Sequence, residues 1–228
     1  MNRTLFAPGG RAITFVDLET TDWVQERIAG GMFYEQKNLE YIRSLNIKGN
    51  YADIGAYVGN HTLFFAFMCP SEKIYCWEPQ ADIFQKLKRN VEVNGLQNKC
   101  VLHNSGIWSE RTFIVSSRPA DPRNRGGQPF MVADNRQAGI QADTLDSYGY
   151  DITVLKIDVE NNELKVLAGA TETLKKVQHV FLELWSVADC RTWNAVCQIP
   201  EAITFFKDRG FEPKTFDNED NLWHFARV

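Results

Sequence analysis

The sequence lacks a long apolar run, an excess of basic residues and any C-x-x-C pair of cysteines. None of its apolar runs approaches the roughly 18 residues that a membrane-spanning helix needs, so we expect no membrane span. Its 25 Lys and Arg residues against 29 Asp and Glu residues give a net charge of −4, which argues against general binding to a nucleic-acid backbone. Residues 1–8 contain one arginine and no apolar core, so they do not resemble a secretory signal.

The five cysteines are odd in number and fit no zinc or redox motif. We therefore expect reduced, mostly buried thiols and a cytoplasmic protein. A chain of 228 residues, 44% hydrophobic and 24% charged, can bury a core without disulfides and is too apolar to be disordered. Length and composition thus predict a single globular domain over residues 1–228.

From residue 50 onward, short apolar runs alternate with amphipathic segments, which indicates an α/β sheet covered by helices. The expected strands cover residues 50–54, 73–77, 100–103, 154–157 and 180–184. The expected helices cover residues 60–68, 81–94, 162–176 and 200–209. A closing antiparallel hairpin is expected from residues 211–216 and 222–228, around a turn at Asp217–Asn221.

Two stretches fall outside this alternation. Residues 1–46 form an N-terminal extension, in which a helix is expected over residues 34–45. Residues 109–150 form an insertion between the third and fourth core strands, with several prolines, glycines and arginines. An insertion of this length is more often functional than a plain connector.

The strongest local signal follows the first expected strand, in the segment YADIGAYVGNHT at residues 51–62. Gly55 and Gly59 would let the backbone approach a ligand, and the following helix would point its N–H groups at that ligand. Their spacing does not fit the G-x-G-x-x-G pattern of a dinucleotide site. Asp53, at the strand end, suits a ligand that carries an amine, such as the methionine part of S-adenosylmethionine. Glu78, 25 residues later, stands near the spacing at which an acidic residue holds ribose hydroxyls in both cofactor types.

These motifs, together with W-E-P at 77–79, V-L-K-I-D-V-E at 154–160 and F-L-E-L at 181–184, resemble the FkbM-type methyltransferases over about residues 33–185. The resemblance implies a Rossmann-like class I methyltransferase fold of the α/β class. Its sheet would have seven strands, mostly parallel with an antiparallel last strand, and helices on both faces. The implied cofactor is S-adenosylmethionine, and many members are associated with O-methylation of sugars or natural products.

The chain departs from the family pattern at two places. Tyr57 stands where Asn is usual, which alters contacts expected at the amino-acid end of the cofactor. Asn161-Asn162 stands where Gly-Ala is usual, which changes the loop beside the expected reaction centre.

Residues from four segments are candidates for binding the cofactor. Those of the glycine motif and the second strand end are Asp53, Gly55, Tyr57, Gly59, Asn60, His61, Glu78 and Pro79. Asn104 and Ser105 stand where this class often meets the adenine, or they form a plain turn. Tyr34 and Glu35 match a family tendency to place an aromatic-acidic pair before the core, and they could close over the cofactor or pack the first helix. His61 begins a helix, which favours a neutral hydrogen-bonding role over a cation.

Carboxylates follow the ends of two neighbouring expected strands. Asp158, Glu160 and Glu183 are therefore the candidates for removing a proton from the acceptor and for positioning it. A positioned base is typically worth roughly 10²–10⁴-fold in rate. Alternation along an extended strand would put residues 158 and 160 on the same side. Structural roles stay open, since Glu160 could cap the next helix and Lys156 could pair with Asp158. The three carboxylates could also form an oxygen-rich site for a divalent metal.

The main hypothesis is an S-adenosylmethionine-dependent O-methyltransferase that acts on a hydroxyl of a sugar, glycan or natural product. The alternatives are a nucleic-acid or N-methyltransferase, a nicotinamide dehydrogenase and a catalytically silent cofactor-binding module. The arginine-rich segment 118–136 could be a lid over an anionic or sugar acceptor, or a solvated loop. Trp108, Trp185 and Trp193 could stack on a sugar or pack in the core. The sequence indicates neither the acceptor nor an oligomeric state.

Overall fold

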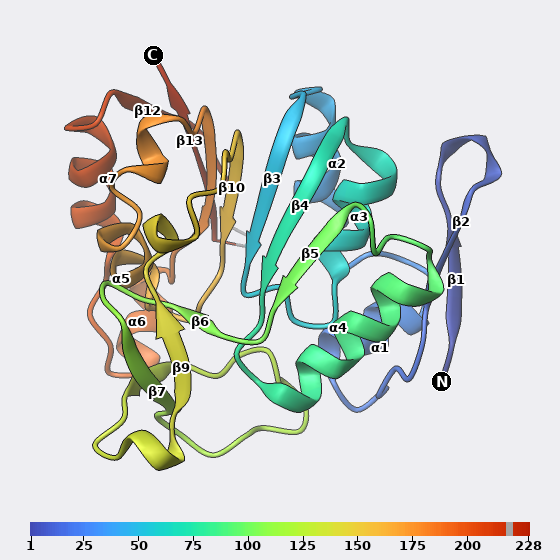
Figure 1. Ribbon diagram of the computed structural model, residues 1–228, viewed down its shortest axis with the longest axis horizontal. Coiled ribbons are helices and arrows are strands. Elements are labelled where there is room, and N and C mark those ends of the chain that lie inside the picture. Colours follow the sequence, from blue (N-terminus) through green and yellow to red (C-terminus); the bar gives the residue numbers. More distant parts are fainter. Residues whose placement is uncertain (218–220) are drawn as a thin grey trace.

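A computed structural model describes residues 1–217 and 221–228, and its centre is a seven-stranded sheet in the order β12-β13-β11-β10-β3-β4-β5 (Figure 1). These strands are β3 (Gly49–Ile54), β4 (Ser71–Trp77), β5 (Cys100–His103), β10 (Val154–Ile157), β11 (His179–Glu183), β12 (Phe211–Asp217) and β13 (Leu222–Arg227). Only β13 runs antiparallel to its neighbours in this sheet. The expected mostly parallel sheet with an antiparallel last strand is confirmed. The turn expected at Asp217–Asn221 includes residues 218–220, which lie outside the described residues.

Helices cover both faces of this sheet, as Figure 1 shows. One side carries α1 (Trp23–Ala29), α2 (Gln36–Ser44), α3 (Asn60–Met68) and α4 (Ala81–Val93). The other side carries α5 (Glu163–Ala168), α6 (Val187–Thr192) and α7 (Ile199–Lys207). Alternation along β3 sends Tyr51 into the first of two apolar cores and Ala52 and Ile54 into the second. Because both faces are covered, the central strands read as continuous apolar runs in the sequence.

The single helix expected over residues 162–176 is wrong. Its first part is α5, and after Gly169 only a short 3₁₀ turn forms, η4 (Thr173–Lys175). A Cβ atom on Gly169 would lie 2.0 Å from the carbonyl oxygen of Trp108, so this glycine packs directly on the backbone of the insertion. The carboxylate of Asp146, also from the insertion, accepts the backbone N–H of Thr173 at 2.7 Å. Contacts with a distant segment therefore end the helix, and helical periodicity does not reveal them.

The insertion contributes most of a second sheet. Its four strands are β6 (Gly106–Ile107), β7 (Thr112–Ser116), β8 (Phe130–Val132) and β9 (Ile140–Asp143), in the order β6-β9-β7-β8. The N-terminal extension begins with a hairpin of β1 (Arg3–Phe6) and β2 (Ala12–Phe15). Asn90 of α4 and Asn94, which follows the helix, hold this hairpin, since Asn94 accepts the N–H of Thr14 and Asn90 that of Val16, both at 2.8 Å. Both elaborations thus fold against the central domain.

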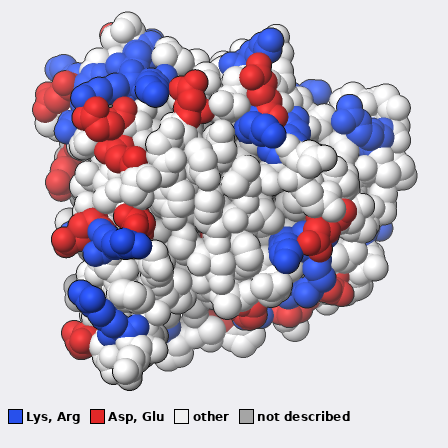
Figure 2. All heavy atoms as spheres, in the orientation of Figure 1, with Lys and Arg blue, Asp and Glu red and all other residues white. Residues whose placement is uncertain are grey.

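No helix among residues 1–217 and 221–228 is long and apolar enough to cross a membrane. All five cysteines are free thiols, and four of them are buried. On the face drawn in Figure 2, Lys and Arg side chains lie close to Asp and Glu side chains around the rim, and the middle is largely uncharged.

Candidate active site

A cavity of about 280 Å³ opens at the carboxyl ends of β3, β4, β10 and β11, where loops leave the sheet. Open α/β sheets bind their ligands at this edge. Ten of the residues expected from the sequence line it: Tyr34, Gly55, Tyr57, Asn60, His61, Glu78, Pro79, Asp158, Glu160 and Glu183. Trp185 and Trp193 line it too, as do Arg118 and Gly126 of the insertion. The arginine-rich segment therefore forms part of the cavity wall.

A smaller apolar cavity of about 30 Å³ adjoins the first across Gly55 and Pro79. Its walls include Ser105, Trp77 and Trp108. Of the two residues expected after the third strand, only Ser105 lines this cavity. Asn104 instead donates its amide N–H to the carbonyl oxygens of Glu78 and Pro79, at 2.9 and 3.1 Å. Asn104 thus fixes the loop that carries Glu78.

The glycine motif brings the ends of β3 and β10 into backbone contact. Gly55 has φ of 82°, and a Cβ atom there would lie 1.8 Å from the carbonyl oxygen of Asp158. Gly59 has φ of 94° and precedes α3, but it does not line the cavity. Tyr57 has φ of 50°, a conformation that costs energy in any residue with a side chain. Its hydroxyl accepts a hydrogen bond at 2.8 Å from Gln25 of the N-terminal extension.

Glu78 is 3% exposed and lines the larger cavity, next to Pro79, which lines both cavities. Its two carboxylate oxygens accept the backbone N–H groups of Tyr57 and Gln80, at 3.0 and 2.8 Å. Burial raises the pKa of Glu78 to about 7, against the opposing effect of these hydrogen bonds. Each carboxylate oxygen has a second lone pair, so the side chain can still accept hydrogen bonds from a ligand.

Asp53 does not line the cavity and lies fully buried behind it. Its Oδ2 accepts the hydroxyl of Thr62 at 2.6 Å, and its Oδ1 lies 3.5 Å from Nζ of Lys156. Lys156 does line the cavity and also donates to Asp158 at 3.1 Å. The ion pair expected between Lys156 and Asp158 is present, and the same ammonium group also serves Asp53.

The electrostatics of this triad follow from burial and proximity. Burial alone would lower the pKa of Lys156, but Asp158 and Asp53 outweigh it and raise that pKa. Burial alone would raise the pKa of Asp158, but the charge of Lys156 brings it below its ordinary value. Asp158 is therefore ionised at neutral pH, and Lys156 is charged.

The other two carboxyl groups behave differently. Burial raises the pKa of Glu160 to about 8, with a further contribution from the charge of Asp158. Burial and Asp158 also raise the pKa of Glu183 well above its ordinary value. A hydrogen bond joins Glu183 to Asp158, and it lowers the pKa of Asp158 while raising that of Glu183. The two carboxyl groups are thus paired, with the protonated form favoured on Glu183 and the ionised form on Asp158.

The strand-alternation argument for residues 158 and 160 is wrong, because β10 ends at Ile157. Glu160 and Asn161 both have a positive φ, 57° and 65°, so the chain turns sharply here, and this turn takes residues 158 and 160 to the same cavity. Glu160 makes no cap for α5. Glu163, the first residue of α5, instead fixes the turn before the helix, since its Oε1 accepts the N–H groups of Val159 and Asn161 at 3.2 Å.

The aromatic-acidic pair of the extension meets the start of α3. Tyr34 and Asn60 exchange two hydrogen bonds, of 2.9 and 3.0 Å, between backbone and side-chain amide. Oε2 of Glu35 lies 3.2 Å from Nε2 of His61, and both side chains are less than a tenth exposed. Glu35 therefore stands behind His61 and does not line the cavity itself. The sequence predicted that Tyr34 and Glu35 belong to the same site as Asn60 and His61, and in the structure these residues are in contact.

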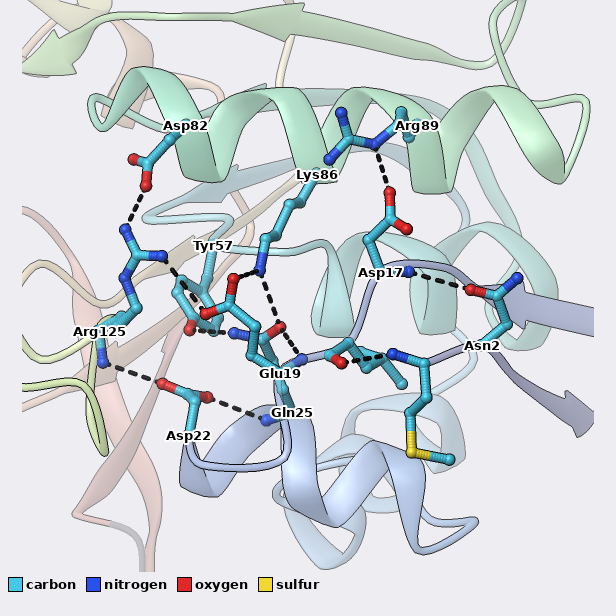
Figure 3. A network of polar contacts seen from close by, with 12 residues as sticks. Asn2, Asp17, Glu19, Asp22, Gln25, Tyr57, Asp82, Lys86, Arg89 and Arg125 are labelled. Atoms are coloured by element: carbon cyan, nitrogen blue, oxygen red, sulfur yellow. Dashed lines mark hydrogen bonds and ion pairs between the residues drawn. The ribbon is translucent and has the colours of Figure 1, made fainter.

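A clasp formed by Arg125 joins the insertion to the extension beside Tyr57 (Figure 3). The backbone N–H of Arg125 donates to Asp22 at 2.9 Å, and its guanidinium donates to Glu19 and to Asp82 of α4. Glu19 also accepts the ammonium group of Lys86 at 2.6 Å. Sequence reasoning missed this clasp, because its members lie up to 106 residues apart and carry no motif.

Across residues 1–217 and 221–228, no three His, Cys, Asp or Glu side chains are grouped so that they could hold a metal ion. The geometry of Asp158, Glu160 and Glu183 therefore gives no support to the metal alternative. Their hydrogen bonds and shifted pKa values instead suit the transfer of a proton.

Comparison with known proteins agrees with the resemblance seen in the sequence. A model of the methyltransferase FkbM domain matches residues 53–213. No curated protein matches the chain. Among solved structures, the chain is similar to the methyltransferase FkbM from Methylobacillus flagellatus KT, with a TM-score of 0.53 and 15% identity. That match covers 78% of this chain and 43% of the other, so the chain spans less than half the length of this relative.

Two further structures share the fold at lower identity. One is a putative rRNA-methylase from Clostridium thermocellum, with a TM-score of 0.53 and 9% identity over 84% of this chain and 94% of that one. The other is an rRNA methylase from Streptococcus thermophilus, with a TM-score of 0.51 and 13% identity over 85% of this chain and 95% of that one. The fold is therefore that of the class I methyltransferases.

Proposed function

Since the chain belongs to the FkbM methyltransferase family, we propose that it uses S-adenosylmethionine to methylate a hydroxyl group of a sugar, glycan or natural-product acceptor. The observation that carries this proposal is the two-sided cavity at the carboxyl ends of the central strands. The glycine motif forms one side, and the carboxyl groups of Asp158, Glu160 and Glu183 form the other.

The residues present fit the cofactor. The backbone of Gly55 and the side chains of Asn60 and His61 would receive its amino-acid end. Glu78, which lines the larger cavity and has lone pairs to spare, would accept the ribose hydroxyls. The small apolar cavity beside Ser105 would receive the adenine. Asp53 would act from behind, by holding Lys156 and Thr62 in place.

When bound, the cofactor supplies an electrophilic methyl group. The acceptor hydroxyl must lose its proton as its oxygen takes that methyl group, and Glu160 is the best-matched base. A base works best when its pKa lies near the operating pH, and the pKa of Glu160 is about 8. Asp158, kept ionised by Lys156, would accept a hydrogen bond from the acceptor and hold it in line. The products are a methyl ether, S-adenosylhomocysteine and a proton, which passes to Glu160 and then to water.

Calorimetric titration with S-adenosylmethionine and, separately, NAD tests the cofactor. We expect micromolar binding of the first, weakened at least tenfold by Glu78→Gln. Glu92→Gln is the matched control, since Glu92 lies on the exposed side of α4 and pairs only with Lys88. Binding of NAD without binding of S-adenosylmethionine would overturn the proposal. Transfer of a labelled methyl group to a panel of hydroxylated acceptors tests the reaction, and cofactor binding without any transfer would favour a silent module.

A further inference from the structure

One corner of the cavity already holds a cation that belongs to the chain itself. The guanidinium of Arg118 lies 4.5 Å from the ring centroid of Trp193, and its charge lowers the pKa of Glu160. Trp185 also lowers the pKa of Glu160, and its ring lies 6.5 Å from that of Trp193. The guanidinium therefore lies over one aromatic ring, and a second aromatic ring and a carboxyl group line the same cavity. Such aromatic faces attract cations through the quadrupole of the ring.

The carboxyl groups near this corner differ in what compensates them. Lys156 is engaged by Asp53 and Asp158, and Glu183 is paired with Asp158. Within residues 1–217 and 221–228, Glu160 and Glu183 form no ion pair with a Lys or Arg side chain. Since Glu183 is paired with Asp158, Glu160 is the carboxyl group of this corner that neither an ion pair nor a second carboxyl group compensates. A buried carboxyl group without a partner needs either a proton or a cation.

We propose that the corner formed by Glu160, Trp185 and Trp193 is a subsite for a cationic group of the acceptor, an ammonium or a guanidinium, and that Arg118 covers it until the acceptor arrives. That the ligand is the acceptor rests on the proposed function, whereas the cation-binding corner does not. A sugar or natural product that carries a basic nitrogen near its reacting hydroxyl would offer both the cation for this corner and the hydroxyl for methylation. The nitrogen would displace Arg118 from Trp193 and compensate Glu160.

An anionic acceptor held by Arg118 fits the geometry less well. The guanidinium donates to the carbonyl oxygen of Gly127 and lies over Trp193, so it is not directed toward the cavity as a free donor. An anion placed there would also lie near Glu160, whose ionised form would repel it.

The test uses methylguanidinium and acetate as probes of opposite charge, titrated into protein saturated with S-adenosylhomocysteine. Tryptophan fluorescence and calorimetry report binding. We expect methylguanidinium to bind at millimolar concentration, and Arg118→Ala or Arg118→Gln to tighten that binding about tenfold because the competing group is gone. Adding Trp193→Leu or Glu160→Gln to Arg118→Ala should remove the gain. Acetate should not bind measurably.

The matched control is the pair Arg123 and Trp23, which lies outside the cavity. Arg123 lies 5.7 Å from the ring centroid of Trp23, and Trp23 is 53% exposed, much like Trp193 at 57%. Arg123→Ala should leave methylguanidinium binding unchanged. An equal gain in Arg123→Ala, or no binding of methylguanidinium by any variant, would overturn the inference. So would acetate binding that Arg118→Ala abolishes.

The affinity for S-adenosylhomocysteine, measured on the same samples, separates this inference from the proposed function. If S-adenosylhomocysteine binds normally but methylguanidinium does not bind, the inference is refuted and the proposed function is not. Binding of methylguanidinium without any binding of S-adenosylhomocysteine refutes the proposed function and leaves the cation corner in place.

Discussion

The two sides of the cavity are built in opposite ways. On the glycine-motif side, Glu78 is satisfied by two backbone N–H groups, and Asn60 is paired twice with Tyr34. On the carboxyl side, Glu160 and Glu183 have no cationic partner among the described residues, and their pKa values are raised by burial. The first side is preorganised around fixed contacts. The second holds groups whose charge can change, which is what proton transfer and exchange of acceptors require.

The two sides also differ in where their residues come from. The glycine-motif side lies mostly within residues 51–79, on β3, β4 and the start of α3. The carboxyl side combines the ends of β10 and β11 with Arg118 of the insertion and Trp193 beyond α6. The first is therefore local in sequence, and the second is assembled by the fold.

The largest effect should come from Gly55→Ala, which creates a steric clash where the two sides of the cavity meet. The new Cβ atom would overlap the carbonyl oxygen of Asp158, and the φ of 82° would be strained as well. We expect a loss of about 3 kcal/mol or more in the free energy of unfolding, and loss of cofactor binding. Urea denaturation measures the first. Gly95→Ala is the control, because it has φ of 68° but open space around it, and should cost only about 1 kcal/mol. Equal costs at the two positions would contradict this account.

The second largest effect should come from Glu160→Gln, which changes the carboxyl side of the cavity and leaves the glycine-motif side intact. We expect kcat to fall by roughly 10²–10⁴-fold while the affinity for S-adenosylmethionine changes less than twofold. Because the base must be deprotonated, kcat of the wild-type protein should rise with pH through the pKa of about 8, and this limb should vanish in the variant. Glu172→Gln, an exposed carboxylate paired with Lys175, is the control. A wild-type rate that is flat between pH 6 and 9 would argue against Glu160 as the base.

The smallest effect should come from opening the clasp, with Arg125→Ala. This guanidinium is about one quarter exposed, and partly exposed ion pairs are typically worth up to about 1 kcal/mol. We expect the dissociation constant for S-adenosylmethionine to rise about fivefold, with kcat at saturation unchanged. Arg89→Ala is the control. It removes the ion pair between Arg89 of α4 and Asp17 of the extension, and it should not change the dissociation constant. A fall in kcat at saturating cofactor would show that the clasp also shapes the carboxyl side.

Local pattern predicted much of the fold. The expected strands at residues 100–103 and 154–157 and the expected helix at 60–68 have the observed bounds. Periodicity succeeded there because each element buries a face determined by its own sequence. It failed at residues 162–176, where Gly169 and Asp146 end the helix through contacts with the insertion.

The candidate site divides in the same way. The glycine motif, Glu78 and the three carboxyl groups could be named from four ordered motifs, and the family they resemble is confirmed. The burial of Asp53 behind Lys156, the pairing of Asp158 with Glu183, and the clasp of Arg125 could not be named in this way. Each depends on contacts between residues that no sequence motif links.

The sequence by itself determined which residue types stand at the ends of which strands, and hence the family. Only the tertiary structure decided the charge state of those residues and what covers them. The physical reason is that backbone preferences and apolar periodicity act over a few residues. Desolvation and Coulomb energies depend instead on distances across the fold, as between Arg118 and Trp193 or Lys156 and Asp53.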